Sequence, residues 1–143
     1  EKYVPHIMQM LSQAAQTTVP PDDDDMIDYL NILREGILES LTGMLQGLHN
    51  EGNGSRAVAM EPFMQTVIQL LQMVSADQNR DLAVSKHAVG LLGDIVQALG
   101  VKMRPSLRGA WAQALITECE QSGEEDAVEN ASWAKQMVFG AQQ

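Results

Sequence analysis

The chain has 143 residues and a net charge of −10 at neutral pH, and it is 45% hydrophobic, 4% aromatic and 20% charged. This composition suits one globular domain and is too apolar for a disordered chain. The negative charge argues against nucleic-acid binding and against binding to anionic membranes, because both attract basic surfaces. A basic protein or peptide partner fits the charge, and acidity that only keeps the chain soluble explains it equally well.

The composition also limits the structural class. Leu, Met, Ala and Gln are plentiful, and these unbranched side chains favour helices over strands. No apolar run approaches the roughly 18 residues of a membrane-spanning helix, and the N-terminus lacks the pattern of a signal peptide. The single cysteine, Cys119, excludes an internal disulfide and fits a reducing compartment. We therefore expect an all-α fold.

The first two helices are predicted at about residues 3–16 and 25–49. Two prolines follow the first helix, and a run of four aspartates at 22–25 provides the acidic start that suits the second. The predicted buried row of the second helix steps by three or four residues. It consists of Leu30, Leu33, Ile37, Leu41, Met44 and Leu48. Residues 50–55 are predicted as a loop.

Four further helices are predicted, at about residues 60–76, 81–99, 105–120 and 124–139. Gly100 is expected to end the second of these and Gly123 to separate the last two. In the helix at 81–99, the predicted buried residues are Val84, Ala88, Leu91, Leu92, Ile95 and Leu99. In the helix at 105–120, the predicted inward residues are Leu107, Trp111, Ala114 and Leu115. No stretch predicts a strand.

The predicted helices form pairs that recur. The second, fourth and sixth end near Leu48, Leu99 and Phe139, which gives a period of roughly 40–50 residues, typical of HEAT repeats. Because one helical hairpin cannot bury its own apolar faces, such pairs stack. The sequence therefore predicts a single domain, 1–143, that is an α-solenoid fragment of about three HEAT-type hairpins. Their approximate ranges are 1–49, 58–100 and 104–140.

Three stretches, in order along nearly the whole chain, resemble the C-terminal part of the importin-β (karyopherin-β) family. They are Asp25–Glu35 (DMIDYLNILRE), Gly90–Gly100 (GLLGDIVQALG), and Leu115–Glu118 (LITE) followed by Ala131–Ala134 (ASWA). The resemblance implies the last three HEAT repeats of a longer nuclear import receptor. It also implies a location in the cytoplasm and nucleus and at the nuclear pore.

One face of the second helix carries an acid-rich polar stripe opposite its predicted core. It consists of Asp28, Asn31, Glu35, Glu39, Thr42 and Gln46. The fourth and sixth helices have polar faces of the same kind. In a solenoid, the second helices of the pairs line the concave side, which is commonly the binding side. We therefore expect a protein-binding wall formed by Asp28, Asn31, Glu35, Glu39, Asp94, Asp126, Glu129 and Trp133. The alternative is an ordinary solvated helix face.

Trp133 lies among carboxylates on the polar side of its predicted helix. An exposed tryptophan in this setting can stack on an arginine whose charge the neighbouring acids pair. The alternative is packing against the preceding repeat. The resemblance implies contact with the basic segment of an importin-α-type adaptor or a basic cargo. Trp111 lies on an apolar face and is predicted to belong to the core.

Other partners follow only from the resemblance. Family members bind phenylalanine-glycine nucleoporins between helices, and Ran-GTP contacts lie in earlier repeats. We expect no catalytic, cofactor or metal site, because the three histidines sit singly and Cys119 has no nearby partner in sequence. The competing hypothesis is a HEAT scaffold subunit of a phosphatase or chromosome-organising type, which would bind through loops or convex helices and be indifferent to Trp133.

Overall fold

The structure, a computed structural model, describes residues 6, 8, 9 and 13 and the ranges 22–50, 61–77 and 80–140. Its elements are α2 (Asp24–Asn50), α3 (Met64–Ala76), α4 (Leu82–Leu99), the 3-10 helix η2 (Val101–Leu107), α5 (Ala110–Glu120) and α6 (Glu125–Phe139). These described ranges contain no strand, and the predicted all-α class is confirmed. Most of the predicted first helix and the whole predicted loop at 50–55 lie outside the described residues.

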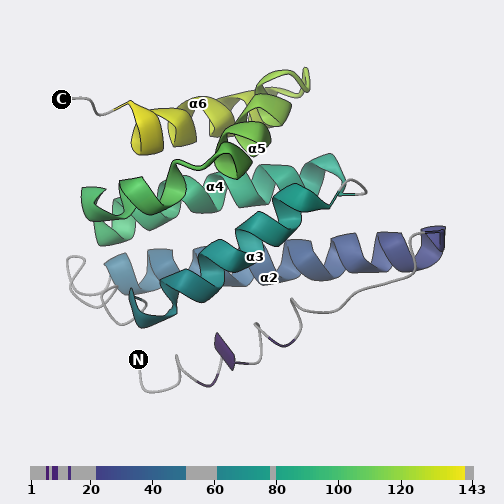
Figure 1. Cartoon of the computed structure of the whole chain (residues 1–143), viewed down its shortest axis with the longest axis horizontal. Helices are drawn as coiled ribbons and strands as arrows, with labels where there is room; N and C mark the ends of the chain where they lie inside the picture. Colours follow the sequence, from purple (N-terminus) through teal and green to yellow (C-terminus); the bar gives the residue numbers. More distant parts are fainter. Residues whose placement is uncertain are drawn as a thin grey trace.

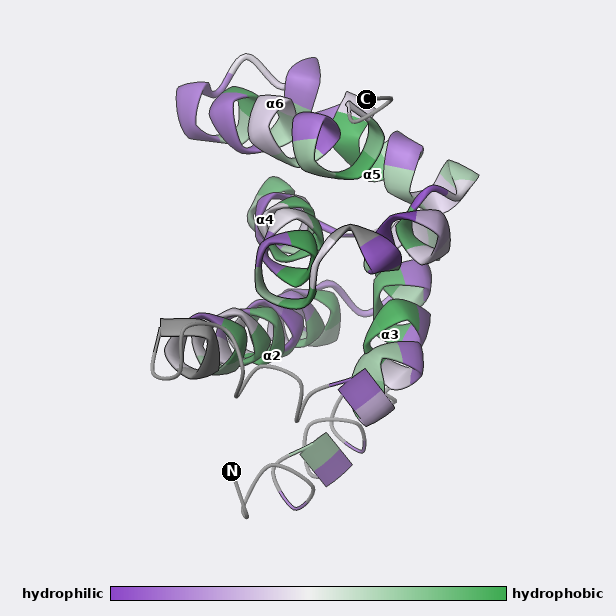
Figure 2. Ribbon diagram, turned by 90° about the vertical axis from the view of Figure 1, so that its left-hand side faces the viewer, coloured by the Kyte–Doolittle hydropathy of each residue, from purple (hydrophilic) through white to green (hydrophobic). Residues whose placement is uncertain are grey.

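The helices form two layers. In Figure 1, α2, α4 and α6 run one above another, and α3 and α5 cross them obliquely. Figure 2 shows the same layers from the side, with α2, α4 and α6 on one side and α3 and α5 on the other. Helix α4 packs along both α2 and α6, and α3 packs on α5. This is the stacking of hairpins expected of an α-solenoid.

The helix boundaries follow the local signals in the sequence. The carboxylate of Asp81 accepts a hydrogen bond from the backbone N–H of Val84 at 3.0 Å and caps the start of α4. Gly100 ends α4 with a φ of +94°, and Gly123 has a φ of +79° before α6 begins. Glycine adopts such left-handed conformations without strain. The predicted ends of these helices are therefore confirmed to within a residue or two.

The predicted helix at 105–120 is wrong at its start. Pro105 lies inside η2, and α5 begins only at Ala110. Gly109 has an extended backbone, and a β-carbon there would collide with the indole of Trp111. The break allows η2 to bury Leu107 completely. Trp111 packs against the core as predicted, whereas Ala114 is exposed and was wrongly placed inside.

Helix α4 is the centre of the core. Its apolar residues interlock with those of both layers, and the predicted buried row is confirmed at Val84, Ala88, Leu91, Leu92, Ile95 and Leu99. By length and composition alone α4 could also cross a membrane, the one helix among the described residues that could. The expectation that no segment approaches that length is therefore wrong. Most of α4 is buried between α2 and α6, as in the core helix of a soluble domain.

Candidate protein-binding surface

The solvent side of α2, α4 and α6 forms one continuous surface, which we call the inner wall. A groove of about 320 Å³ crosses it and is lined from all three helices. Its lining residues are Thr42 and Gln46 of α2, Lys86, His87, Gly90, Asp94 and Gln97 of α4, and Asn130 and Trp133 of α6. The tertiary structure thus brings the polar faces of the three helices side by side, with α4 as the floor of the groove.

Trp133 sits at the edge of this groove with 36% of its surface exposed. Its ring lies against the backbone of α4 at Gly93, where a β-carbon would come within 3.0 Å of three indole carbons. The absent side chain at Gly93 therefore makes room for the indole. Trp133 packs on the preceding repeat, as the alternative interpretation expected, and it also leaves part of its surface exposed to the groove. Its role in binding a partner stays a prediction.

Asp94 lines the groove but is only 5% exposed. Its carboxylate accepts a hydrogen bond from Nε2 of Gln46 at 3.3 Å. Burial raises the pKa of Asp94, and the hydrogen bonds from Gln46 and Thr42 oppose that rise. A carboxylate in this position is poorly hydrated and gains from a cation placed in the groove. Asp94 is therefore deeper in the wall than the sequence indicated.

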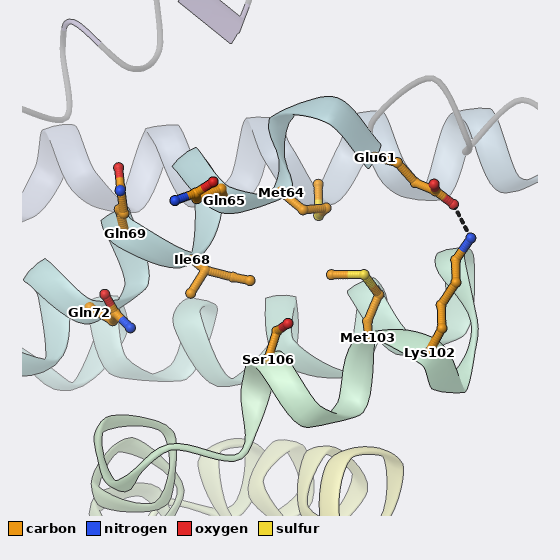
Figure 3. A pocket seen from close by; sticks show the side chains of 9 residues that line it. All are labelled: Glu61, Met64, Gln65, Ile68, Gln69, Gln72, Lys102, Met103 and Ser106. Carbon is orange, nitrogen blue, oxygen red and sulfur yellow. Dashed lines mark hydrogen bonds and ion pairs between the residues drawn. The ribbon is translucent and has the colours of Figure 1, made fainter.

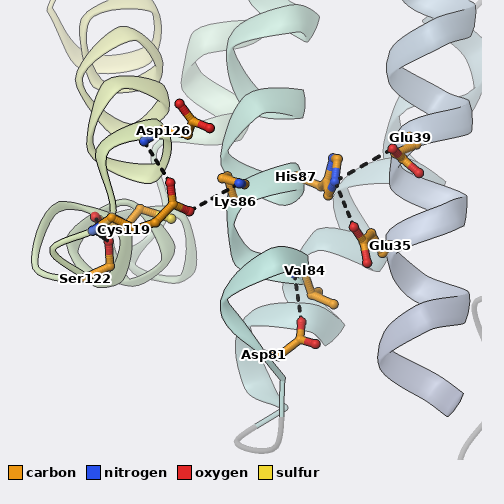
Figure 4. Close-up of polar contacts among 10 residues, drawn as sticks. Glu35, Glu39, Asp81, Val84, Lys86, His87, Cys119, Ser122 and Asp126 are labelled. Carbon is orange, nitrogen blue, oxygen red and sulfur yellow. Dashed lines mark hydrogen bonds and ion pairs between the residues drawn. The ribbon is translucent and has the colours of Figure 1, made fainter. Parts of the chain in front are cut away.

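Glu35 and Glu39 face His87 across the contact between α2 and α4 (Figure 4). Nε2 of His87 lies 3.2 Å from Oε2 of Glu35 and 3.9 Å from Oε2 of Glu39. Glu35 is half-buried and Glu39 is exposed, and the sequence analysis did not identify His87 as their partner. His87 is three residues before Gly90 and so shares the polar face of α4, a signal that the spacing did contain.

Lys86, the residue before His87, projects toward the other neighbour of α4 (Figure 4). Its Nζ lies 3.2 Å from Oε2 of Glu124, which precedes α6. This contact lowers the pKa of Glu124. Lys86 and His87 therefore contact carboxylates on opposite sides of α4.

Asn31 is a correction to the predicted wall, since only 5% of its surface is exposed. The buried face of α2 is wider than the predicted row because it includes a second row at Asn31, Leu38 and Leu45. Helix α2 packs along α4 for much of its length, and this contact also covers the row of residues beside the predicted buried row. Asn31 is thus buried and, unlike Asp94, does not line the groove.

The remaining predicted residues are exposed but lie outside the groove. They are Asp28 on α2 and Asp126 and Glu129 on α6. The backbone N–H of Asp126 donates to the Glu124 carboxylate at 2.8 Å, which fixes the start of α6. Asp28, Asp126 and Glu129 therefore add negative charge to the surfaces of α2 and α6 without lining the groove.

The described residues offer little for metal or nucleophile chemistry. Within ranges 22–50, 61–77 and 80–140, no three His, Cys, Asp or Glu side chains are grouped so as to hold a metal ion. Cys119 is buried, and that burial raises the pKa of its thiol to about 11. A thiol with this pKa stays protonated at neutral pH and is a weak nucleophile.

A second groove, of about 620 Å³, opens between α3 and η2 on the outer layer (Figure 3). Its apolar lining consists of Met64, Ile68 and Met103, and its polar lining is mainly the amides of Gln65, Gln69 and Gln72. At one end Lys102 and Glu61 form an ion pair, so their charges offset each other. The outer groove is therefore nearly neutral, unlike the inner wall.

The stacked helical hairpins define an α-solenoid segment. The family model for "Importin subunit beta-1-like, TPR repeats" matches residues 1–120. Importin subunit beta-1 of Arabidopsis thaliana is 31% identical over 99% of the chain, and that of Schizosaccharomyces pombe is 27% identical over 96%. The chain belongs to the importin-β family of nuclear transport receptors, and the resemblance noted in the sequence is confirmed.

Solved structures agree with this assignment. A crystal structure of importin-β superposes with a TM-score of 0.88 at 29% identity over 96% of the chain. Yeast importin-β shares the fold, with a TM-score of 0.79 at 23% identity. The chain spans 16% of the length of each of these relatives and structures.

Proposed function

We propose that this chain is part of a nuclear import receptor and that its inner wall binds a basic segment of an importin-α-type adaptor or of a basic cargo. The observation that carries the proposal is the groove shared by α2, α4 and α6, which combines an open tryptophan face with a poorly hydrated carboxylate, Asp94. Family membership and the net charge of −10 support it. The proposal implies a protein that works in the cytoplasm, in the nucleus and at the nuclear pore.

An arginine side chain suits this groove chemically. Its guanidinium stacks on an indole face and at the same time donates several hydrogen bonds to carboxylate and amide oxygens. Trp133 supplies the face, and Asp94 and Gln97 supply acceptors in the same groove. Glu39, Asp126 and Glu129 add exposed charges, each worth about 0–1 kcal/mol in an ion pair. Affinity therefore depends on many contacts along a long ligand.

The test is fluorescence anisotropy of a labelled Arg/Lys-rich peptide titrated with wild-type and Trp133→Ala protein at low and moderate salt. We expect salt-sensitive binding that weakens about tenfold on loss of the indole. Trp133→Phe, which keeps an aromatic face, is expected to lose less. Gln69→Ala on the outer layer is the matched control and is expected to bind like wild type. Equal binding by wild type and Trp133→Ala would contradict the proposed site.

The outer groove favours a second candidate function, binding of phenylalanine-glycine nucleoporins. Met64, Ile68 and Met103 give a flexible apolar floor that adapts to an aromatic ring, and the glutamine amides can bond to a peptide backbone. Because the groove is nearly neutral, we expect this binding to be insensitive to salt. Ile68→Ser is expected to weaken a phenylalanine-glycine peptide and leave the basic peptide unaffected. Loss of both ligands together would argue against two separate surfaces.

A further inference from the structure

The inner wall contains two bases of its own, and they already occupy part of its acidic surface. Lys86 and His87 are consecutive on α4, so their side chains leave the helix about 100° apart. One therefore reaches Glu124 near α6, and the other reaches Glu35 and Glu39 on α2 (Figure 4). Both bases line the groove that the proposed ligand would enter.

The two contacts differ in how they respond to pH. Lysine keeps its charge throughout the neutral range, so Lys86 pairs with Glu124 at any pH of interest. Histidine is the side chain that changes charge between about pH 5 and 8. When protonated, His87 donates to the Glu35 carboxylate as an imidazolium and attracts that of Glu39. When neutral, it offers Glu35 at most an uncharged hydrogen bond and no longer attracts Glu39, so a ligand cation meets weaker competition.

The groups around His87 come from all three helices of the inner wall. The groups that face it from α2 are the acidic Glu35 and Glu39, and those contributed by α6 to the groove are the uncharged Asn130 and Trp133. Lys86 and Asp94 are the charged groups beside it on α4. The side chain of His87 is 28% exposed, so both protons and ligands reach it.

We propose that His87 is an internal competitor for the Glu35–Glu39 part of the inner wall, which makes binding of a basic ligand weaken as the pH falls. A ligand cation that pairs with these glutamates must displace the imidazolium, so ligand and proton exclude each other at this position. By linkage, ligand binding favours the neutral imidazole, and acidification favours release. This inference rests on the proposed function and names the residue that regulates it.

The experiment titrates the labelled Arg/Lys-rich peptide at about pH 6 and about pH 8 against wild type, His87→Gln and His6→Gln. Wild type and the His6→Gln control are expected to bind about two- to fivefold more weakly at the lower pH, the size of one exposed ion pair. His87→Gln, which keeps a polar side chain without a titrating charge, is expected to show little change. Lys86→Met is expected to strengthen binding equally at both pH values, because it frees Glu124.

A second measurement follows the imidazole of His87 by NMR while peptide is added at about pH 6. Displacement toward the resonance of the neutral ring is expected. An equal pH response in wild type and His87→Gln, or an unchanged ring on peptide addition, would overturn the inference while leaving the proposed function intact. Absence of peptide binding by every variant at both pH values would overturn the proposed function, and the inference with it.

Discussion

The inner wall and the outer groove are built from the same repeating hairpins and yet differ in chemistry. On the wall, charged groups of neighbouring helices meet across α4, and a tryptophan rests on a glycine. On the outer layer, glutamines and methionines surround one ion pair, which leaves little net charge. Both layers bury similar aliphatic rows toward the common core. Hairpin stacking therefore constrains the inward faces of the helices and leaves the chemistry of the solvent faces free to differ.

The largest expected effect is a loss of stability when Arg80, which links helices of the two layers, is removed. Arg80, between α3 and α4, donates through Nη1 to the carbonyl oxygens of Ser75 at 2.9 Å and Asp77 at 2.8 Å. Its Nε donates to Ser85 at 3.0 Å, and Nη2 pairs with Glu118 of α5. Removing a partly buried cation from such a network leaves several acceptors unpaired. We expect Arg80→Ala to lower the free energy of unfolding by about 3 kcal/mol in urea titrations.

Lys102→Ala is the control for this prediction, because it breaks an ion pair at the solvent-exposed end of the outer groove. Exposed pairs contribute about 0–1 kcal/mol. If the two variants lost equal stability, Arg80 would not be the residue that joins the layers.

The next prediction compares the stability effects of alanine substitution at two glycines on the same face of α4. At Gly93 a β-carbon would collide with the indole of Trp133, whereas at Gly90 it would lie 3.8 Å from Nδ2 of Asn130, an ordinary contact. We expect Gly90→Ala to stabilise the fold by about 0.5–1 kcal/mol through helix propensity. Gly93→Ala is expected to destabilise it by about 1–3 kcal/mol and to weaken basic-peptide binding, because the ring must move.

Urea unfolding and peptide anisotropy measure both variants. A Gly93→Ala protein that is as stable as Gly90→Ala, with unchanged tryptophan fluorescence, would show that the indole does not depend on this contact.

A smaller expected effect tests whether a carboxylate on the inner wall contributes more to basic-peptide binding than a carboxylate elsewhere on the surface. Glu39→Gln removes an exposed carboxylate from the inner wall, and Glu120→Gln removes one from α5, where it pairs with Lys135 at 3.4 Å. Both variants lose the same net charge. We expect about two- to threefold weaker basic-peptide binding for Glu39→Gln at low salt and almost no change for Glu120→Gln. Equal losses would mean that only overall charge attracts the ligand.

The smallest effect concerns the pH dependence of stability at Asp94. Burial raises its pKa in the folded state above the ordinary 3.8, so the folded protein holds this proton more tightly than the unfolded chain. The resulting stability is fully present below pH 3.8 and is lost as the pH rises through the raised pKa. Asp94→Asn removes this loss. Its stability relative to wild type is therefore expected to improve as the pH rises above 3.8, measured by urea unfolding. A difference that stays constant as the pH rises would contradict the assigned burial.

Local sequence signals determined the helices and their ends. Asp81 caps α4, Gly100 and Gly123 permit the left-handed turns, and apolar spacing located the buried row of α4. These signals act within a few residues, so one sequence is enough to interpret them. At Pro105 the local pattern predicts the start of an α-helix, and the structure instead has the 3-10 helix η2 there. Burial of Leu107 and the close approach of Gly109 to Trp111 set the actual break.

Of the predicted wall residues, Asp94 and Trp133 line the groove, and their role in binding stays a prediction. Asp28, Glu35, Glu39, Asp126 and Glu129 were expected to be solvent-accessible, and each is exposed or half-buried. Only the tertiary structure decided that Asn31 is covered, that Asp94 lies deep in a groove, and that Trp133 rests on Gly93. It also decided that His87 meets two glutamates of another helix. Periodicity gives the direction of a side chain around its own helix, whereas the register and rotation between helices come from the packing of the whole core.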